Sequence, residues 1–174
     1  GQLDQALEDF TTAVALGDRN AIGYYNRGHV YQTKGELDLA LADYTRAIEI
    51  NPRYFDAYRQ RGYIYQSRSQ FDQALADYST LITIEPGWFR PYNYRGLVYQ
   101  AKGEHKRALA DFDQALKIWP WYAEAYFNKG QSYLKLGLKK EAGSAFQDFL
   151  RHAPANDPGV EIAKHWLTEL GVRQ

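Results

Sequence analysis

Apolar and aromatic residues recur along the chain at spacings of four and then three positions, with polar and charged residues between them. Tyr24, Gly28 and Tyr31 show this spacing first, and the segment 40–47 shows it again. Because residues three and four apart share one face of an α-helix, each pattern predicts an amphipathic helix. Gly35 stands between the two patterns, where a residue of left-handed conformation can end the first helix. The pattern therefore predicts a hairpin of two antiparallel helices.

This two-helix pattern is repeated with a period of 34 residues, as the spacing of Pro52 and Pro86 shows. The other positions that recur at this period are small or aromatic. They are Tyr24, Tyr58, Tyr92 and Tyr126; Gly28, Gly62, Gly96 and Gly130; Tyr31, Tyr65, Tyr99 and Tyr133; Ala40, Ala74, Ala108 and Ala142; Tyr44, Tyr78, Phe112 and Phe146. Small residues beside aromatic rings predict a close approach of the two helices. In one repeat Ser69 replaces the glycine that ends the first helix, and we expect the backbone of Ser69 to be strained.

The period predicts a single domain that covers residues 1–174. Its parts are a half repeat at 1–20 that contains only a second helix, full repeats at 21–54, 55–88, 89–122 and 123–156, and a capping helix at 157–174. Asp157 and Pro158 begin the last helix as an N-cap followed by a first-turn proline. Ile162, Trp166 and Leu170 follow at helical spacing, so we expect them to form the apolar stripe of this cap.

The order aromatic, Gly, Tyr, Gly, Ala, aromatic, Ala and Pro within each period resembles the tetratricopeptide repeat family over residues 1–156. The resemblance implies an all-α fold, a right-handed α-solenoid of helix-turn-helix hairpins with a C-terminal capping helix. In such solenoids the first helices line an extended concave face. One departure is a basic residue before each conserved Gly of the first helix, such as Arg61. We expect each base to pair with an acid of the preceding repeat, such as Asp43.

Charge and composition narrow the class of partner. Lys plus Arg and Asp plus Glu both number 21, so the formal net charge is zero and no overall field attracts nucleic acid. An RNA-binding helical repeat is therefore the least favoured alternative. No apolar run approaches the roughly 18 residues of a membrane-spanning helix, so we expect no membrane partner. The chain has no Cys, which fits a reducing or an oxidising compartment and leaves the localisation open.

Side chains suited to catalysis or metal binding occur singly. The four histidines, His29, His105, His152 and His165, form no pair at helical spacing and no HExxH motif. The repeat explains the glycines, so no phosphate-binding loop is predicted. Glu104 and His105 are expected to lie in a solvated turn. We therefore expect no enzyme activity, no catalytic residue, no cofactor and no metal site.

The resemblance implies a non-catalytic scaffold for protein–protein interaction that binds a protein or an extended peptide in the concave groove of the first helices. Groove positions combine aromatic rings, amides and arginines, which can cover apolar side chains and pair with a peptide backbone. The predicted binding residues are Tyr25, Asn26, His29, Gln32, Arg59, Gln60, Tyr63, Gln66, Arg90, Asn93, Tyr94, Leu97, Gln100, Phe127, Asn128 and Gln131.

Chaperone-binding members of the family hold a C-terminal carboxylate with a clamp that resembles Lys and Asn on one first helix, Asn on the next, and Lys and Arg on the third. Two groups of three successive first helices could hold such a clamp in this chain. The equivalent positions contain a single cation in each group, Arg90 in the first and Arg59 in the second. Carboxylate-clamp chaperone tails are therefore disfavoured as partners. A ligand with aromatic or aliphatic anchors, and one acidic group opposite the two arginines, fits better.

The first 20 residues support an alternative function. Leu3, Ala6, Leu7 and Phe10 are apolar, and the half repeat has no first helix to cover them. The alternative is a self-associating repeat module that forms a homodimer through this end. Another interpretation places more repeats before this end in a parent protein. Because the chain has no Met, even at position 1, it resembles a trimmed, excised or engineered fragment.

Overall fold

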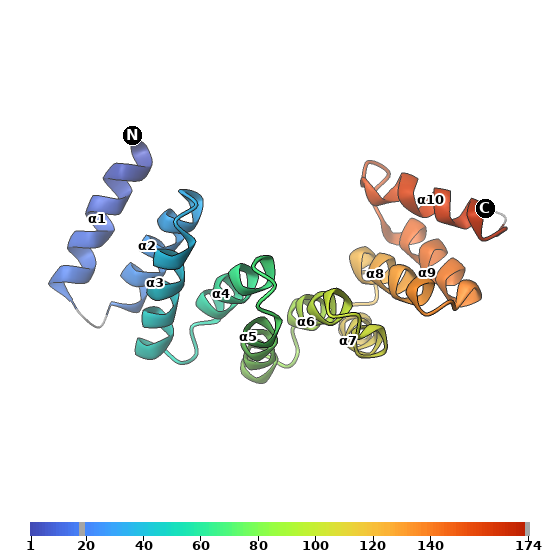
Figure 1. Cartoon of the computed structure of the whole chain (residues 1–174), viewed down its shortest axis with the longest axis horizontal. Helices are drawn as coiled ribbons and strands as arrows, with labels where there is room; N and C mark the ends of the chain where they lie inside the picture. Colours follow the sequence, from blue (N-terminus) through green and yellow to red (C-terminus); the bar gives the residue numbers. More distant parts are fainter. Residues whose placement is uncertain (18–19, 173–174) are drawn as a thin grey trace. The chain divides into compact units, whose positions relative to one another are not determined.

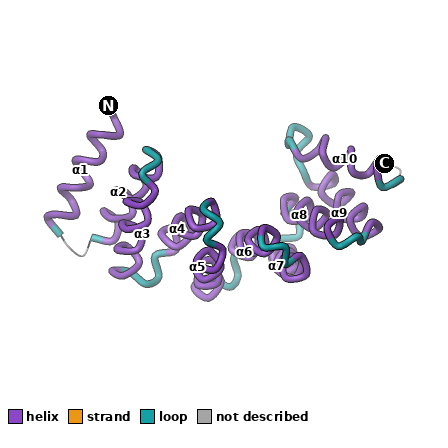
Figure 2. Tube along the Cα trace, in the orientation of Figure 1, coloured by secondary structure: helices purple, strands orange, loops and turns teal. Residues whose placement is uncertain are grey.

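The computed structural model describes residues 1–17 and 20–172, and this part of the chain contains ten α-helices and no strand (Figure 1, Figure 2). The helices are α1 (Gln2–Leu16), α2 (Ala21–Thr33), α3 (Leu37–Ile50), α4 (Phe55–Ser67), α5 (Phe71–Ile84), α6 (Phe89–Ala101), α7 (His105–Ile118), α8 (Ala123–Lys135), α9 (Lys139–His152) and α10 (Gly159–Glu169). The predicted all-α fold of helical hairpins is therefore confirmed.

The chain divides into two compact units, Gly1–Ile84 (unit 1) and Glu85–Gln174 (unit 2). In unit 1, α2 pairs with α3 and α4 pairs with α5, while α1 packs against α2 and α3 packs against α4. In unit 2, α6 pairs with α7 and α8 pairs with α9, while α7 packs against α8 and α9 packs against α10. The single-domain organisation and the repeat boundaries stay predictions. Residues 18–19 of the half repeat and 173–174 of the cap lie outside the described residues.

Each first helix ends at a residue with a left-handed backbone. Gly35, Gly103 and Gly137 have φ angles of 81°, 77° and 74°, and Ser69 takes the same place with a φ of 58°. The backbone N–H groups of Ser69 and Gln70 donate to carbonyls of the last turn of α4. This pair of hydrogen bonds is the Schellman motif, which satisfies carbonyls that the helix leaves free. The predicted turn is confirmed, together with the unfavourable backbone of Ser69.

Replacing Ser69 with Gly is expected to raise the free energy of unfolding by about 1 kcal/mol, because a left-handed backbone costs a non-Gly residue about 1–2 kcal/mol. The reciprocal change Gly35→Ser is expected to lower it by a similar amount. A Cβ at Gly35 would meet no atom within 4 Å, so this control tests the backbone alone. Urea unfolding measures both changes. Equal stability of Ser69→Gly and the unchanged chain would show that Ser69 carries no strain.

The two helices of each hairpin approach where a glycine faces a ring. A Cβ added to Gly28 would lie 3.1 Å from the Tyr44 ring, and one added to Gly96 would lie 2.5 Å from the Phe112 ring. Tyr44 and Phe112 are fully buried. The predicted packing of small residues against large ones is therefore confirmed, and the glycine sets the distance between the helices.

The basic residue of a first helix pairs with the acid of its own hairpin. Arg61 Nε and Nη2 donate to the two carboxylate oxygens of Asp77 at 3.0 and 2.7 Å. Its Nη1 donates to Thr45 Oγ1 of the preceding repeat at 3.1 Å. The predicted ion pair between Arg61 and Asp43 is wrong, because Asp43 binds Arg27 through two hydrogen bonds of 2.7 and 2.8 Å. These hydrogen bonds raise the pKa of Arg27.

Unit 2 shows the same rule and one exception. Arg95 binds Asp111 of its own hairpin through two hydrogen bonds of 2.8 and 2.7 Å. Ala145 stands where the next hairpin would have this acid, and Lys129 pairs instead with Asp113 of the preceding repeat at 2.5 Å. The residue before the conserved Gly therefore faces the second helix of its own hairpin, and it reaches back where that helix has no acid.

The last helix buries a different stripe from the predicted one. Val160, Ala163 and Leu167 are buried, whereas Ile162 is 47% exposed and Trp166 is 37% exposed. The prediction that Ile162 and Trp166 belong to the buried stripe is therefore wrong. Spacings of three and four both fit a helical face, and only the position of α9 selects which face of α10 is covered.

The start of α10 agrees with the prediction in part, because the helix begins at Gly159 with Pro158 at the N-cap position and Asp157 one residue before it. Asp157 Oδ1 accepts a hydrogen bond from the backbone N–H of Gly159 at 2.8 Å. The buried stripe then joins Phe146 and Phe149 of α9 in one apolar cluster. The helix thus covers the core of unit 2 with one side and leaves Trp166 on another.

Candidate functional site

The predicted binding residues lie on the first helices. We call the exposed side of α2 and α4 the first-helix face of unit 1, and the exposed side of α6, α8 and α10 the first-helix face of unit 2. We include α10 because it packs against a preceding second helix, α9, as α8 packs against α7. In this respect α10 takes the place of a further first helix.

Unit 1 exposes two of the predicted groups, His29 and Tyr63, and part of a third, Arg59, whose side chain is 33% exposed. His29 is exposed, and Tyr63, at the same position of the next repeat, is 59% exposed. Arg59 lies one turn before Tyr63 and pairs with Asp56 of its own helix at 3.1 Å. Such a pair on one helix contributes only about 0.3–0.5 kcal/mol, so the guanidinium group can exchange it for an acid of a ligand. These side chains offer a ring, an imidazole and a cation to a partner.

The other predicted residues of unit 1 pack within it. The ring of Tyr25 lies 5.7 Å from that of Tyr44 and 5.1 Å from that of Tyr54. Burial raises the pKa of the Tyr25 hydroxyl, and the Asp56 carboxylate raises it further. Two predicted glutamines accept hydrogen bonds from buried tyrosine hydroxyls: Gln32 from Tyr44 at 2.6 Å and Gln66 from Tyr78 at 3.2 Å. The remaining two, Asn26 and Gln60, are half-buried.

A polar network connects α6 and α8 in unit 2. Asn93 is fully buried, and its Nδ2 donates to Tyr122 Oη at 3.1 Å and to Glu124 Oε1 at 3.0 Å. Asn128 Nδ2 donates to Asn93 Oδ1 at 3.1 Å, and Gln100 Nε2 donates to the backbone carbonyl of Asn128 at 2.7 Å. Burial raises the pKa of Tyr122, and the charge of Glu124 raises it further. The three predicted amides thus hold two first helices together.

The rest of the predicted set in unit 2 divides between the core and the surface. The ring of Phe127 lies 5.1 Å from that of Phe149 on α9. Tyr94 is half-buried. Arg90 is exposed, with its guanidinium group 5.7 Å from the ring centre of Phe89. Of these side chains, Arg90 is the most accessible to a partner.

The residues predicted for self-association lie on α1. Leu3 is 42% exposed, while Ala6, Leu7 and Phe10 are half-buried. The apolar surface that they leave is modest in a helix that packs against α2. Association of two chains through this helix stays a prediction.

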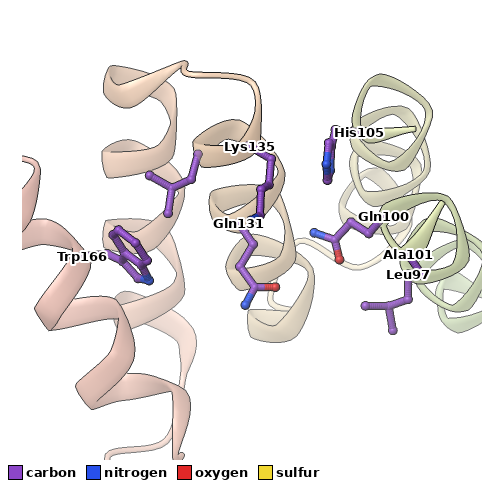
Figure 3. A pocket seen from close by; sticks show the side chains of 8 residues that line it. Leu97, Gln100, Ala101, His105, Gln131, Lys135 and Trp166 are labelled. Atoms are coloured by element: carbon purple, nitrogen blue, oxygen red, sulfur yellow. The ribbon is translucent and has the colours of Figure 1, made fainter. Parts of the chain in front are cut away.

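A pocket of about 620 Å³ opens on the first-helix face of unit 2. Its lining residues come from α6, α7, α8 and α10, and they are Leu97, Gln100, Ala101, His105, Gln131, Leu134, Lys135 and Trp166. Figure 3 shows Trp166 of α10 and Leu97 of α6 on either side of Gln131 of α8. The structure therefore brings together three predicted binding residues, Leu97, Gln100 and Gln131, with five that were not predicted.

Two polar groups of this pocket lack a partner within the part of the chain that the structure describes. His105 Nδ1 is buried and forms no hydrogen bond there. Lys135 forms no ion pair with a described residue, and its side chain lines the same pocket as His105 (Figure 3). A ligand that supplied an acid or another hydrogen-bonding group would satisfy both, and an unsatisfied buried nitrogen costs about 1–3 kcal/mol.

The sequence contained a signal for one of the missed residues. Leu134 lies one period after the predicted Gln100, so the repeat itself indicated this residue. Trp166 lies one period after Ser132, which was not a predicted residue, so the period gave no signal for it. His105 had no such signal. It follows the turn after α6, and the expectation of a solvated turn is wrong for its buried ring nitrogen.

Four family models match the chain, all with descriptions of tetratricopeptide repeats. They match residues 21–54, 43–76, 96–137 and 123–156. Together they cover more than half of the sequence, and the matches at 21–54 and 123–156 coincide with the hairpins α2–α3 and α8–α9. The chain is a helical repeat protein, and it belongs to the tetratricopeptide repeat family. The search of curated proteins found no match.

Solved structures share this fold at low sequence identity. The crystal structure of MamA aligns with a TM-score of 0.82 at 22% identity, covering 87% of this chain and 89% of that one. MamA 41-end from Desulfovibrio magneticus RS-1 aligns with a TM-score of 0.81 at 17% identity, covering 90% of this chain and 89% of that one. YrrB, described as a TPR protein with an unusual peptide-binding site, aligns with a TM-score of 0.74 at 24% identity. This alignment covers 97% of this chain and 87% of that one. At these identities the likeness shows the fold alone.

The family supports a protein–protein interaction scaffold in general. Within residues 1–17 and 20–172, no helix combines the length and the apolar character that crossing a membrane requires. In the same residues, no group of three or more His, Asp or Glu side chains is placed to hold a metal ion.

Proposed function

We propose that the chain is a non-catalytic scaffold that binds a peptide or a partner protein through the first-helix faces of its repeats. The observation that supports this function most is the pocket on unit 2, which has a volume of about 620 Å³ and lies among α6, α8 and α10. Ligand sites typically have volumes of about 300–1,000 Å³, mostly apolar walls and a few polar groups. The pocket has this composition.

The predicted binding residues divide into two roles under this proposal. Tyr63, Arg59 and His29 on unit 1, and Arg90, Tyr94, Leu97 and Gln131 on unit 2, contact the partner. The buried members of the set support the first helices from within their own unit. Rings and arginines of this kind supply a large share of the binding free energy at protein interfaces.

A binding role fits the chemistry of the pocket better than catalysis does. Its lining offers one imidazole and one ammonium group, from His105 and Lys135, and neither a carboxylate nor a hydroxyl stands among the lining residues. General acid–base or nucleophilic catalysis commonly pairs such groups with a carboxylate, a hydroxyl or a thiol. These two side chains are therefore assigned to recognition.

Replacing Arg59 with Glu, Tyr63 with Ala and Tyr94 with Ala is expected to reduce the capture of partner proteins by at least about tenfold, because two ring contacts and a cation are lost. Capture from a lysate of the source cells by the bead-bound chain, with quantitative mass spectrometry, measures the loss. A matched control carries Gln73→Ala, Lys117→Glu and Gln147→Ala, at exposed positions of second helices. Partners that remain bound to the first variant and leave the control would contradict the proposal.

Self-association through α1 and RNA binding are retained as alternatives of lower rank. The zero formal charge removes the main driving force for binding a polyanion. Self-association uses Leu3, the most exposed of the four predicted contact residues. Neither alternative accounts for the pocket on unit 2.

A further inference from the structure

We infer that the pocket on unit 2 binds a segment of a partner protein in which an aromatic or aliphatic side chain stands next to acidic residues. This inference rests on the proposed function and specifies the chemistry of the partner. It follows from three features of the pocket: its apolar walls, the positive charge at its rim, and the unsatisfied nitrogen of His105.

The apolar walls are supplied by helices of different repeats. Leu97 and Ala101 lie on α6, Leu134 lies on α8, and Trp166 lies on α10. Trp166 is 37% exposed, although α10 buries its opposite stripe against α9. A tryptophan left open to solvent in a pocket that two leucines also line gives an apolar side chain of a partner a surface to cover, at about 25 cal/mol per Å² of apolar area. The walls therefore favour an aromatic or aliphatic anchor.

The rim carries an excess of positive charge. Lys135 lines the pocket, and a second pocket of about 300 Å³ shares His105 with it and is lined by Lys106, Arg107 and Glu104 among others. The charge of Glu104 is already compensated, since Arg107 Nη1 lies 2.6 Å from its carboxylate. Neither Lys135 nor Lys106 forms an ion pair with a described residue. An acidic segment would complement these charges, whereas a basic segment would be repelled.

His105 adds a reason for a polar group beside the anchor. Its Nδ1 is buried and lacks a partner among the described residues, although it lines both pockets. A purely apolar ligand would seal this nitrogen away from water without a hydrogen bond, which is costly. A carboxylate can accept a hydrogen bond from the Nδ1–H tautomer and contact Lys135 at the same time.

The two requirements can be separated with four pools of short fluorescein-labelled peptides. The central residue is either apolar (Leu, Phe or Trp) or Ser, and the flanking residues are either acidic (Asp and Glu) or basic (Lys and Arg), which gives four combinations. All C-termini are amidated so that only side chains carry the charge. Fluorescence anisotropy with the full chain measures the affinities. We expect the acidic pool with apolar centres to bind at least about tenfold more tightly than each pool that lacks one of the two features.

Two variants assign this preference to the pocket. Lys135→Glu is expected to weaken binding of the acidic apolar pool about tenfold and to favour the basic apolar pool. Trp166→Ala is expected to remove most of the advantage of apolar centres over Ser. Lys140→Glu is the matched control, because Lys140 is exposed on α9 and lies outside the pocket lining. Circular dichroism confirms that each variant is folded.

The outcomes distinguish this inference from the proposed function. A preference of the basic pool, or an acidic apolar preference that Lys135→Glu and Trp166→Ala leave unchanged, would overturn the inference while peptide binding by the chain would stand. Absence of binding to all four pools would also overturn the inference. Only the loss-of-capture experiment on partner proteins decides the proposed function, so the two failures remain separate.

Discussion

Replacing Asp77 with Ala is expected to lower the free energy of unfolding by about 3–5 kcal/mol, because the change leaves the Arg61 guanidinium group buried without its acid. The Asp77 side chain is 4% exposed and that of Arg61 is 17% exposed, so water cannot readily replace the carboxylate. Burial raises the pKa of Asp77 even with Arg61 beside it, which indicates a large cost of removing this carboxylate from water. Urea unfolding of the variant measures the loss.

A pair of double-mutant cycles tests the partner of Arg61 directly. Alanine substitutions at Arg61 and Asp77 are expected to give a coupling free energy of about 1–3 kcal/mol, because the two side chains share two hydrogen bonds. Arg61 and Asp43 are expected to show less than about 0.5 kcal/mol, since Asp43 is bound by Arg27. A larger coupling free energy for Arg61 with Asp43 than for Arg61 with Asp77 would show that the ion pairs connect successive repeats and not the two helices of one hairpin.

Replacing Gly96 with Ala is expected to lower the free energy of unfolding by about 1–3 kcal/mol, because the new methyl group has no room. Its Cβ would lie 2.5 Å from Cε1 of Phe112, a ring that is fully buried and cannot move away. In an open helix the same change would stabilise by about 1 kcal/mol, so the sign of the effect reports the close approach. Urea unfolding again gives the measurement.

The equivalent glycines provide a graded control for this prediction. Their Cβ-to-ring distances would be 3.1 Å at Gly28, 2.8 Å at Gly62, 2.6 Å at Gly130 and 2.5 Å at Gly96. We expect the cost of the Ala substitution to rise in this order and to be near zero at Gly28, where a small shift of the ring suffices. An equal cost at all four positions would mean that the ring contacts do not set the spacing of the helices.

The sequence was sufficient to predict the features that depend on the chain nearby. The period of 34 residues, the hairpins and the positive φ at Gly35 and Ser69 follow from helical spacing and turn chemistry within one repeat. The approach of Gly96 to Phe112 also repeats within each hairpin. Periodicity identifies such features because each repeat meets the same neighbours.

Prediction was weaker where two faces of one helix have similar composition. Ile162 and Trp166 share a helical spacing as good as that of Val160 and Leu167, yet α9 covers the second pair. The pattern offered Arg61 two acids, Asp43 in the preceding repeat and Asp77 in its own hairpin. The rotation of its helix turns Arg61 toward Asp77. The amphipathic pattern gives the presence of a buried face but not which of two similar faces it is.

The amino-acid sequence by itself determined the class of this protein, because small and aromatic residues at one period can pack well only as stacked helical hairpins. Only the tertiary structure decided which first-helix residues remain open to a partner. Asn93 turned inward to join α6 to α8, while His105 and Trp166 came together from different helices to line one pocket. Side chains distant in sequence meet through the rotation and crossing of their helices, and packing across repeats sets that geometry.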